Sequence, residues 1–134
     1  MITQLSIYAE NKKGAMKEMT SLLQQAGLDI DAFVTNDSAE FGTVRMIVSD
    51  PDKAYDIFTR AGYLVKKVSV LMVAITDVVG SLDKLLECIQ QANVNIDYLY
   101  ATYDRISAGP IIVIRTEDMA ELENYLRSHG YATR

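Results

Sequence analysis

The sequence QQAGLDID at residues 24–31 recurs as QQANVNID at residues 90–97, and five of the eight positions are identical. The same shift of 66 residues superposes apolar positions of the first half on apolar positions of the second, so the chain is a tandem repeat. Gly27 and Asn93 are equivalent in this alignment, and both residue types tolerate the left-handed backbone conformation that ends a helix. Both halves are therefore predicted to end a helix in the same way.

Each half shows strand and helix signals in the same order. An apolar stripe at helical spacing follows the first strand of each half. The stripe consists of Met16, Met19, Leu22, Leu23 and Ala26 in the first half and of Leu82, Leu85, Cys88, Ile89 and Ala92 in the second. Strands are expected over residues 5–9, 28–35, 44–48 and 63–68, and over residues 71–75, 94–103 and 111–114.

A second helix is predicted in each half. Asp50 followed by Pro51 is a strong helix start, and Gly62 ends that helix. Its counterpart is predicted to begin near Thr116 and to end at Gly130. Only residues 131–134 follow Gly130 in the sequence, so we expect a truncated last strand in the second half.

The order strand, helix, strand, strand, helix, strand is that of a ferredoxin-like layer, in which an antiparallel sheet carries two helices on one face. We therefore expect an α+β fold made of two βαββαβ units side by side. The predicted units cover residues 1–68 and residues 69–134.

Composition and charge exclude several classes of protein for this chain. The 134 residues are 49% hydrophobic and 23% charged, which excludes a disordered or fibrous chain. The longest apolar run, residues 70–75, is far shorter than the ~20 residues of a membrane helix. A single cysteine, Cys88, and no signal peptide predict a cytoplasmic protein without membrane contacts. The net charge of -5 argues against a nucleic-acid partner.

The loop between the first strand and the first helix carries a family resemblance. Both halves have Asn or Asp three residues before a glycine there, and both have an Ile-Asp strand after the helix. With the Phe41-Gly42 turn after Glu40, the whole chain resembles the small bacterial proteins made of two tandem ACT domains. It departs from the family's commonest loop, which has proline before the glycine, where this chain has Lys13 and Val79.

The resemblance implies regulatory binding of a small molecule, usually an amino acid, in a cleft between two side-by-side units. A ligand carboxylate suits the positive N-terminus of a helix, and a ligand ammonium suits backbone carbonyls or the side chains of Asn11 and Asp77. The implied loop residues are Asn11, Lys12, Lys13, Gly14, Ala15, Met16, Asp77, Val78, Val79, Gly80, Ser81 and Leu82. The implied opposite walls are Ile30 and Asp31 in one half and Ile96 and Asp97 in the other.

The loop residues also have simpler structural interpretations. Gly14 and Gly80 also suit a tight strand-to-helix turn that needs no ligand, and Asn11 and Asp77 are common turn or cap residues. We favour solvent-exposed charges over anion binding for Lys12 and Lys13.

Other reactive residue types have structural explanations. Cys88 lies in the apolar stripe and is expected to be a small buried hydrophobe. His129 precedes the glycine that ends the last helix, where a cation suits the helix dipole. For Tyr98, Tyr100 and Tyr103, sheet packing or a dimer contact competes with an aromatic wall beside a ligand. With one His and one Cys, no zinc site can be assembled from soft ligands within the chain.

No nucleophilic triad, phosphate loop or pair of acids at a pocket is present in the sequence, so we predict no enzyme, no cofactor and no metal. The expected function is a non-catalytic regulatory module that binds an amino acid. We expect a homodimer and a partner enzyme of amino-acid metabolism. The alternative is an interaction subunit that binds a partner enzyme through its sheet edge without a small ligand.

Overall fold

The computed structural model of the protein describes residues 1–10, 12–36 and 41–134. The described chain divides into two compact units, which we call the first unit (Thr3–Val68) and the second unit (Ser69–Arg134 with Met1–Ile2). The elements that begin in the first half of the chain are β1 (Ile2–Glu10), α1 (Ala15–Gln25), β2 (Ile30–Thr35), β3 (Phe41–Val48), α2 (Pro51–Arg60) and β4 (Leu64–Ala74). The others are α3 (Ser81–Gln91), β5 (Tyr98–Asp104), β6 (Gly109–Arg115) and α4 (Met119–Ser128).

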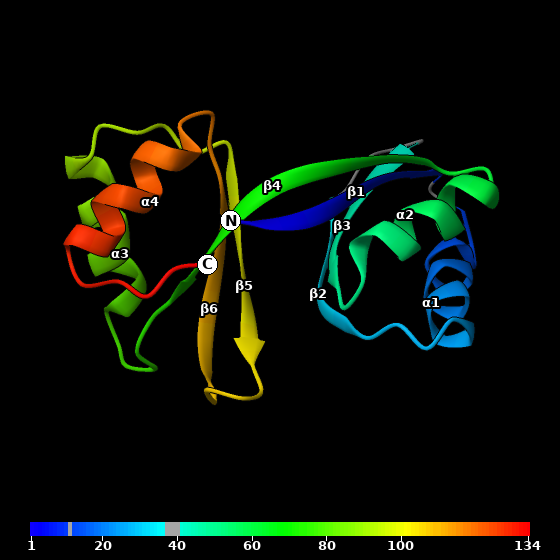
Figure 1. Ribbon diagram of the computed structural model, residues 1–134, viewed down its shortest axis with the longest axis horizontal. Helices are drawn as coiled ribbons and strands as arrows, with labels where there is room; N and C mark the ends of the chain where they lie inside the picture. Colours follow the sequence, from blue (N-terminus) through cyan, green and yellow to red (C-terminus); the bar gives the residue numbers. More distant parts are fainter. Residues whose placement is uncertain (11, 37–40) are drawn as a thin grey trace. The chain divides into compact units, whose positions relative to one another are not determined.

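The sheet of the first unit has the strand order β2-β3-β1-β4, to which β4 contributes its first residues. β3 is antiparallel to both neighbours, so that Met46 lies opposite Leu5 of β1 and Phe33 of β2. Helices α1 and α2 pack together against this sheet (Figure 1). Met19 of α1 and Phe58 of α2 are fully buried in the core that they form with the sheet.

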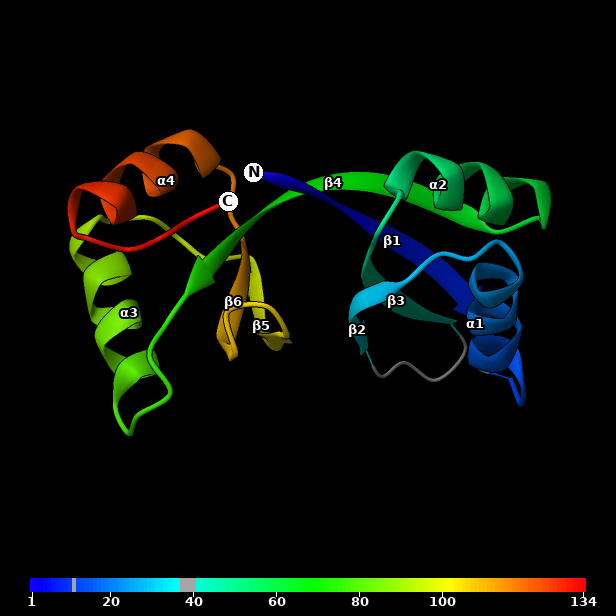
Figure 2. The same ribbon diagram turned by 60° about the horizontal axis from the view of Figure 1, so that its bottom comes forward.

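The second unit repeats this arrangement. β6 is antiparallel to both β4 and β5, and helices α3 and α4 cover one face of the sheet (Figure 2). Residues 132–134 pair with β4, because Arg134 and Met72 exchange backbone hydrogen bonds of 2.7 and 3.0 Å. The α+β prediction of two ferredoxin-like units with antiparallel sheets is therefore confirmed.

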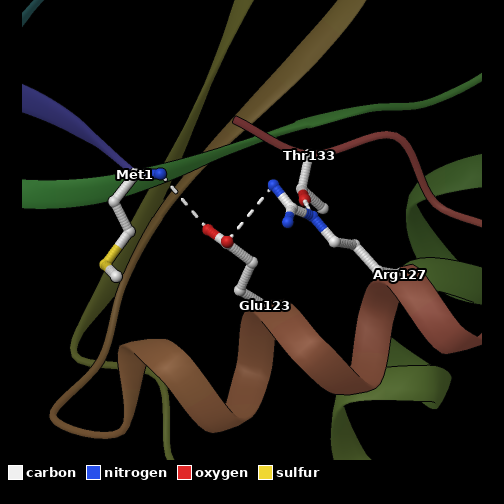
Figure 3. A network of polar contacts seen from close by, with 4 residues as sticks. All are labelled: Met1, Glu123, Arg127 and Thr133. Carbon is white, nitrogen blue, oxygen red and sulfur yellow. Dashed lines mark hydrogen bonds and ion pairs between the residues drawn. The ribbon is translucent and has the colours of Figure 1, made fainter.

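A polar network joins the ends of the second unit to α4 (Figure 3). The carboxylate of Glu123 accepts from the Met1 amino group at 3.2 Å and pairs with the Arg127 guanidinium at 3.2 Å. Arg127 Nε also donates to the Thr133 hydroxyl at 2.7 Å. Residue 133 is thus tied to both β4 and α4.

The predicted start of α2 is confirmed. The side chain of Asp50 accepts a hydrogen bond of 3.1 Å from the Lys53 backbone N–H, and Pro51 occupies the first helical position. Cys88 is buried in the second core, as predicted.

The predicted apolar stripe is wrong at its first position in both halves. Met16 is 51% exposed and Leu82 is 40% exposed, whereas Ala15 and Ser81 are buried. The buried faces follow the positions four residues apart that start at Ala15 and Ser81, so Met16 and Leu82 are rotated about 100° away from the core.

Several boundaries also differ from the predictions. α4 begins at Met119 with Asp118 as its N-cap, not near Thr116. Thr116 is buried, and its hydroxyl donates to the Asn95 carbonyl at 2.6 Å, which holds it in the connection before the helix. β5 begins at Tyr98 rather than near residue 94. β3 begins at Phe41, because Phe41 and Gly42 pair with the end of β1 instead of forming a turn.

Among the residues that the structure describes, no helix has the length and apolar character needed to span a membrane.

Candidate functional site

Each unit has a glycine at the N-cap of its first helix. Gly14 caps α1 with φ +86°, and Gly80 caps α3 with φ +90°. L side chains rarely adopt this left-handed conformation. Among the residues that the structure describes, nothing lies within 4 Å of the position of an added Cβ at either glycine. The backbone conformation, rather than crowding, therefore accounts for both glycines as turn residues, and their contact with a ligand stays a prediction.

The backbone N–H groups at the two helix starts have matching partners. The N–H of Ala15 donates to the Lys12 carbonyl at 3.3 Å, and the N–H of Ser81 donates to the Val78 carbonyl at 3.2 Å. The next two N–H groups of an α-helix have no acceptor within the helix. A glycine N-cap offers no side-chain acceptor either, and no described side chain caps either helix start. These N–H groups are the part of each loop that suits an anion.

The two loops differ in their side chains. In the first loop, Lys12 forms an exposed ion pair of 3.6 Å with Glu10, and Lys13 is exposed. Asn11 lies outside the described residues. In the second loop, Val78 is 66% exposed and Val79 is fully exposed.

Two further residues of the second loop have assigned positions. The hydroxyl groups of Ser81 and Thr76 form a 2.8 Å hydrogen bond, which engages the buried Ser81. Asp77 is exposed.

The candidate residues of the second strands lie elsewhere in their own units. Ile30 and Ile96 are half-buried against the cores, whereas Asp31 and Asp97 are exposed. Ile30 pairs with Val48 at the end of β3, but the first loop follows the β1 residues that pair with the start of β3. The first unit therefore does not bring its own loop and its own second-strand candidates together.

Two grooves flank the first loop inside the first unit. A groove of about 280 Å³ is lined in part by Lys12, Ala15, Met16, Thr35 and Thr43. A larger groove of about 480 Å³ lies on the side of the α2–β4 connection. Its lining includes Lys12 and Ala15, and also Tyr8, Glu18 and Tyr63, which the sequence analysis did not select.

Tyr63 and Glu18 interact with each other in the lining of the larger groove. Burial raises the pKa of the Tyr63 phenol, and a hydrogen bond with the Glu18 carboxylate raises it further. The Tyr63 ring also packs edge-on against Phe58, with ring centroids 5.9 Å apart. No local sequence pattern links Glu18 to Tyr63, because the contact depends on β4 lying beside β1.

The remaining reactive residues occupy structural positions. Burial raises the pKa of the Cys88 thiol, which reduces its reactivity. His129 ends α4 as predicted, and its ring stacks on Tyr125 with centroids 4.2 Å apart. Tyr98 and Tyr100 are half-buried on β5, and Tyr103 is exposed.

No group of three His, Cys, Asp or Glu side chains suited to a metal ion occurs among residues 1–10, 12–36 and 41–134.

Comparison with known proteins places the chain in a family. The sequence matches the ACT domain pair over residues 1–126. Among solved structures, protein BT0572 from Bacteroides thetaiotaomicron is 31% identical, with 98% of this chain and 90% of that chain covered and a TM-score of 0.91.

The fold is also shared with more distant structures. The regulatory subunit of aspartate kinase from Thermus thermophilus, in its ligand-free form, is 13% identical over 96% of this chain and 92% of that chain, with a TM-score of 0.69. The corresponding subunit from Thermus flavus is 11% identical over 94% and 90%, with a TM-score of 0.64. A comparison with curated proteins gave no match. The match over residues 1–126 confirms the resemblance carried by the loops, and the chain belongs to the ACT domain pair family.

Proposed function

We propose that the chain is a non-catalytic regulatory module that binds a small ligand, an amino acid, at its two strand-to-helix loops. The observation that carries this proposal is the matching pair of helix starts, each with a left-handed glycine N-cap and no side-chain cap. Membership of the ACT domain pair family supports it. The proposed functional domains are residues 1–68 and residues 69–134.

The chemistry of an amino acid suits these loops. Its carboxylate accepts from the N–H groups of Met16 and Lys17 in one loop, or of Leu82 and Asp83 in the other. Its ammonium group is held by loop carbonyls and by Asn11 or Asp77. The full proposed set is Asn11, Lys12, Lys13, Gly14, Ala15, Met16, Asp77, Val78, Val79, Gly80, Ser81 and Leu82, with Ile30, Asp31, Ile96 and Asp97 as second-strand contacts.

The proposal extends to a partner. Two Thermus proteins that share the fold are regulatory subunits of aspartate kinase. We accordingly propose that this chain acts on an enzyme of amino-acid metabolism, as a homodimer, in the cytoplasm. Sedimentation of the purified chain at micromolar concentration tests the dimer, and a monomer would contradict it.

A thermal-shift screen with the twenty amino acids tests ligand binding. A ligand present at ~100 times its dissociation constant adds about 2.7 kcal/mol to the free energy of unfolding. For a chain of this size, the midpoint then rises by several degrees. If none of the twenty raises the midpoint, amino-acid binding is rejected.

Glycine variants locate the binding site. Gly14→Ala and Gly80→Ala should each weaken binding of the amino acid found in the screen. Gly27→Ala is the matched control, because Gly27 also has a positive φ of +69° and open surroundings but lies at the other end of α1. Equal loss of affinity in the control would show that the loops are not the site.

The second candidate function is an interaction subunit that binds a partner enzyme through its sheet edge without a small ligand. The observation that favours it is the edge formed by residues 132–134, which pair with β4 through three backbone hydrogen bonds and the Val73–Thr133 bridge. Another chain can extend such an edge. Under this hypothesis, Thr133→Pro reduces partner binding, and the amino-acid screen stays negative.

A further inference from the structure

The larger groove of the first unit shares Ala9, Glu10, Lys12 and Ala15 with the smaller groove, whereas Tyr8, Glu18 and residues 61–64 line only the larger one of the two. Its volume of about 480 Å³ falls within the usual range for small-molecule sites. It is formed where the end of β1, the start of α1 and the α2–β4 connection meet. It includes none of the second-strand residues Ile30 and Asp31.

The charges in this groove favour a cation. Glu10 and Glu18 supply two carboxylates, and Lys12 supplies one ammonium group. Lys12 is already paired with Glu10 at 3.6 Å. Glu18 forms no ion pair within the described part of the chain, and its partner there is the neutral hydroxyl of Tyr63. The Glu18 carboxylate therefore retains acceptor capacity for a second donor.

Two aromatic rings add to this preference. Tyr8 is 44% exposed and Tyr63 is half-buried, and both line the groove. Tyrosine rings attract ammonium ions through their electron-rich faces. The edge-on contact with Phe58 holds the Tyr63 ring in place before a ligand arrives. Because this wall is ordered in advance, ligand binding has a smaller entropic cost.

The second unit lacks this chemistry. The shift of 66 residues places Lys84 at the position of Glu18, Thr76 at that of Glu10 and Ala74 at that of Tyr8. The two carboxylates and the Tyr8 ring are thus properties of the first unit, although both units share the glycine N-cap and Tyr131 follows Gly130 as Tyr63 follows Gly62.

We propose that this groove binds a small organic ammonium ion, with Glu18 as its counter-ion and Tyr8 and Tyr63 as aromatic walls. The site goes beyond the proposed regulatory function, because it uses side chains of one unit and requires no carboxylate on the ligand. It makes the two units unequal in what they recognise.

Titration of the full chain with three probes that share a phenyl group tests this site. The probes are phenethylamine, which carries only an ammonium, 3-phenylpropionate, which carries only a carboxylate, and phenylalanine, which carries both. Binding is followed by two-dimensional NMR of the labelled protein. For ligands of about ten heavy atoms, concentrations up to about 10 mM cover the expected affinity. Phenethylamine should shift the resonances of Glu18 and Tyr63, and 3-phenylpropionate should leave them unchanged.

Matched variants identify the counter-ion. Glu18→Gln removes the charge but keeps an acceptor for Tyr63, and it should weaken phenethylamine binding about tenfold, the effect of one charge-assisted hydrogen bond. Lys84→Gln changes the equivalent position of the second unit and should alter the affinity less than about twofold.

Each outcome decides the proposal. No shift at Glu18 and Tyr63 with phenethylamine, or equal affinity of the wild type and Glu18→Gln, overturns it. If an amino acid raises the unfolding midpoint but phenethylamine does not bind, the ammonium site fails while the proposed regulatory function stands. If phenethylamine binds with the expected dependence on Glu18 and no amino acid does, the reverse holds.

Discussion

The two glycine N-caps allow a stability change to be worked out from backbone geometry. A residue other than glycine in the left-handed conformation costs roughly 1–2 kcal/mol. At Gly14 and Gly80 no steric contact with a described residue adds to this, because a Cβ would meet none of their atoms within 4 Å. Alanine also lowers the conformational entropy of the unfolded chain, and this effect offsets roughly 0.4–1 kcal/mol of the strain. We therefore expect Gly14→Ala or Gly80→Ala to lower the free energy of unfolding by about 1 kcal/mol.

The loss of stability should depend on which residue replaces Gly14. Asparagine tolerates the left-handed region best among the other residues, so Gly14→Asn should cost less than Gly14→Ala. Valine is β-branched and strained at positive φ, so Gly14→Val should cost more. Gly42 is a contrasting control, because its φ is not in the left-handed region and an added Cβ would lie 3.1 Å from the Asn36 carbonyl oxygen.

Urea unfolding followed by circular dichroism measures these differences. The midpoint should fall in the order Asn, Ala, Val, and the slope with urea should stay unchanged. In thermal scans, a loss of about 1 kcal/mol corresponds to about 2 to 8 °C for chains of this size range. A neutral Gly14→Ala variant, or a loss above about 4 kcal/mol, would show that the conformational explanation is wrong.

Three further predictions concern single elements of the fold. Asp50→Ala should lower the free energy of unfolding by about 1 kcal/mol, because it removes the acceptor of the Lys53 N–H. Asp50→Asn keeps an acceptor and should retain most of the stability that alanine loses, as measured by urea unfolding. Leu23→Ala should lower the free energy of unfolding by about 2–5 kcal/mol, because Leu23 is fully buried. Met16 is exposed, so Met16→Ala should change this free energy by less than about 0.5 kcal/mol. Similar losses in the two variants would contradict the assigned core. Burial raises the pKa of the Cys88 thiol, so the unfolded chain loses this proton first as the pH rises. The contribution of Cys88 is therefore fully present below the ordinary thiol pKa and is lost above it, and unfolding midpoints of Cys88→Val should fall less steeply in alkali than those of the wild type.

Local sequence signals were enough for the order of elements, except that the strands expected over residues 63–68 and 71–75 form one strand, β4. The repeat, the left-handed glycines and the Asp50-Pro51 pair act within a few residues, so they predict where helices begin and end without knowledge of the rest of the chain. The same signals carried the family resemblance in both loops. Errors occurred where a position is decided by packing: Thr116 carries a local start signal, but its hydroxyl bond to Asn95 keeps it out of α4.

Tertiary structure alone decided which faces are buried and which side chains meet. Met16 fits an apolar stripe in the sequence, yet the orientation of α1 against the sheet buries Ala15 instead. Glu18 and Tyr63 are far apart in the chain, and they meet because β4 lies beside β1. Helical spacing and turn chemistry are short-range properties of the backbone, whereas a groove depends on strand pairing between distant segments, which no single stretch of sequence encodes.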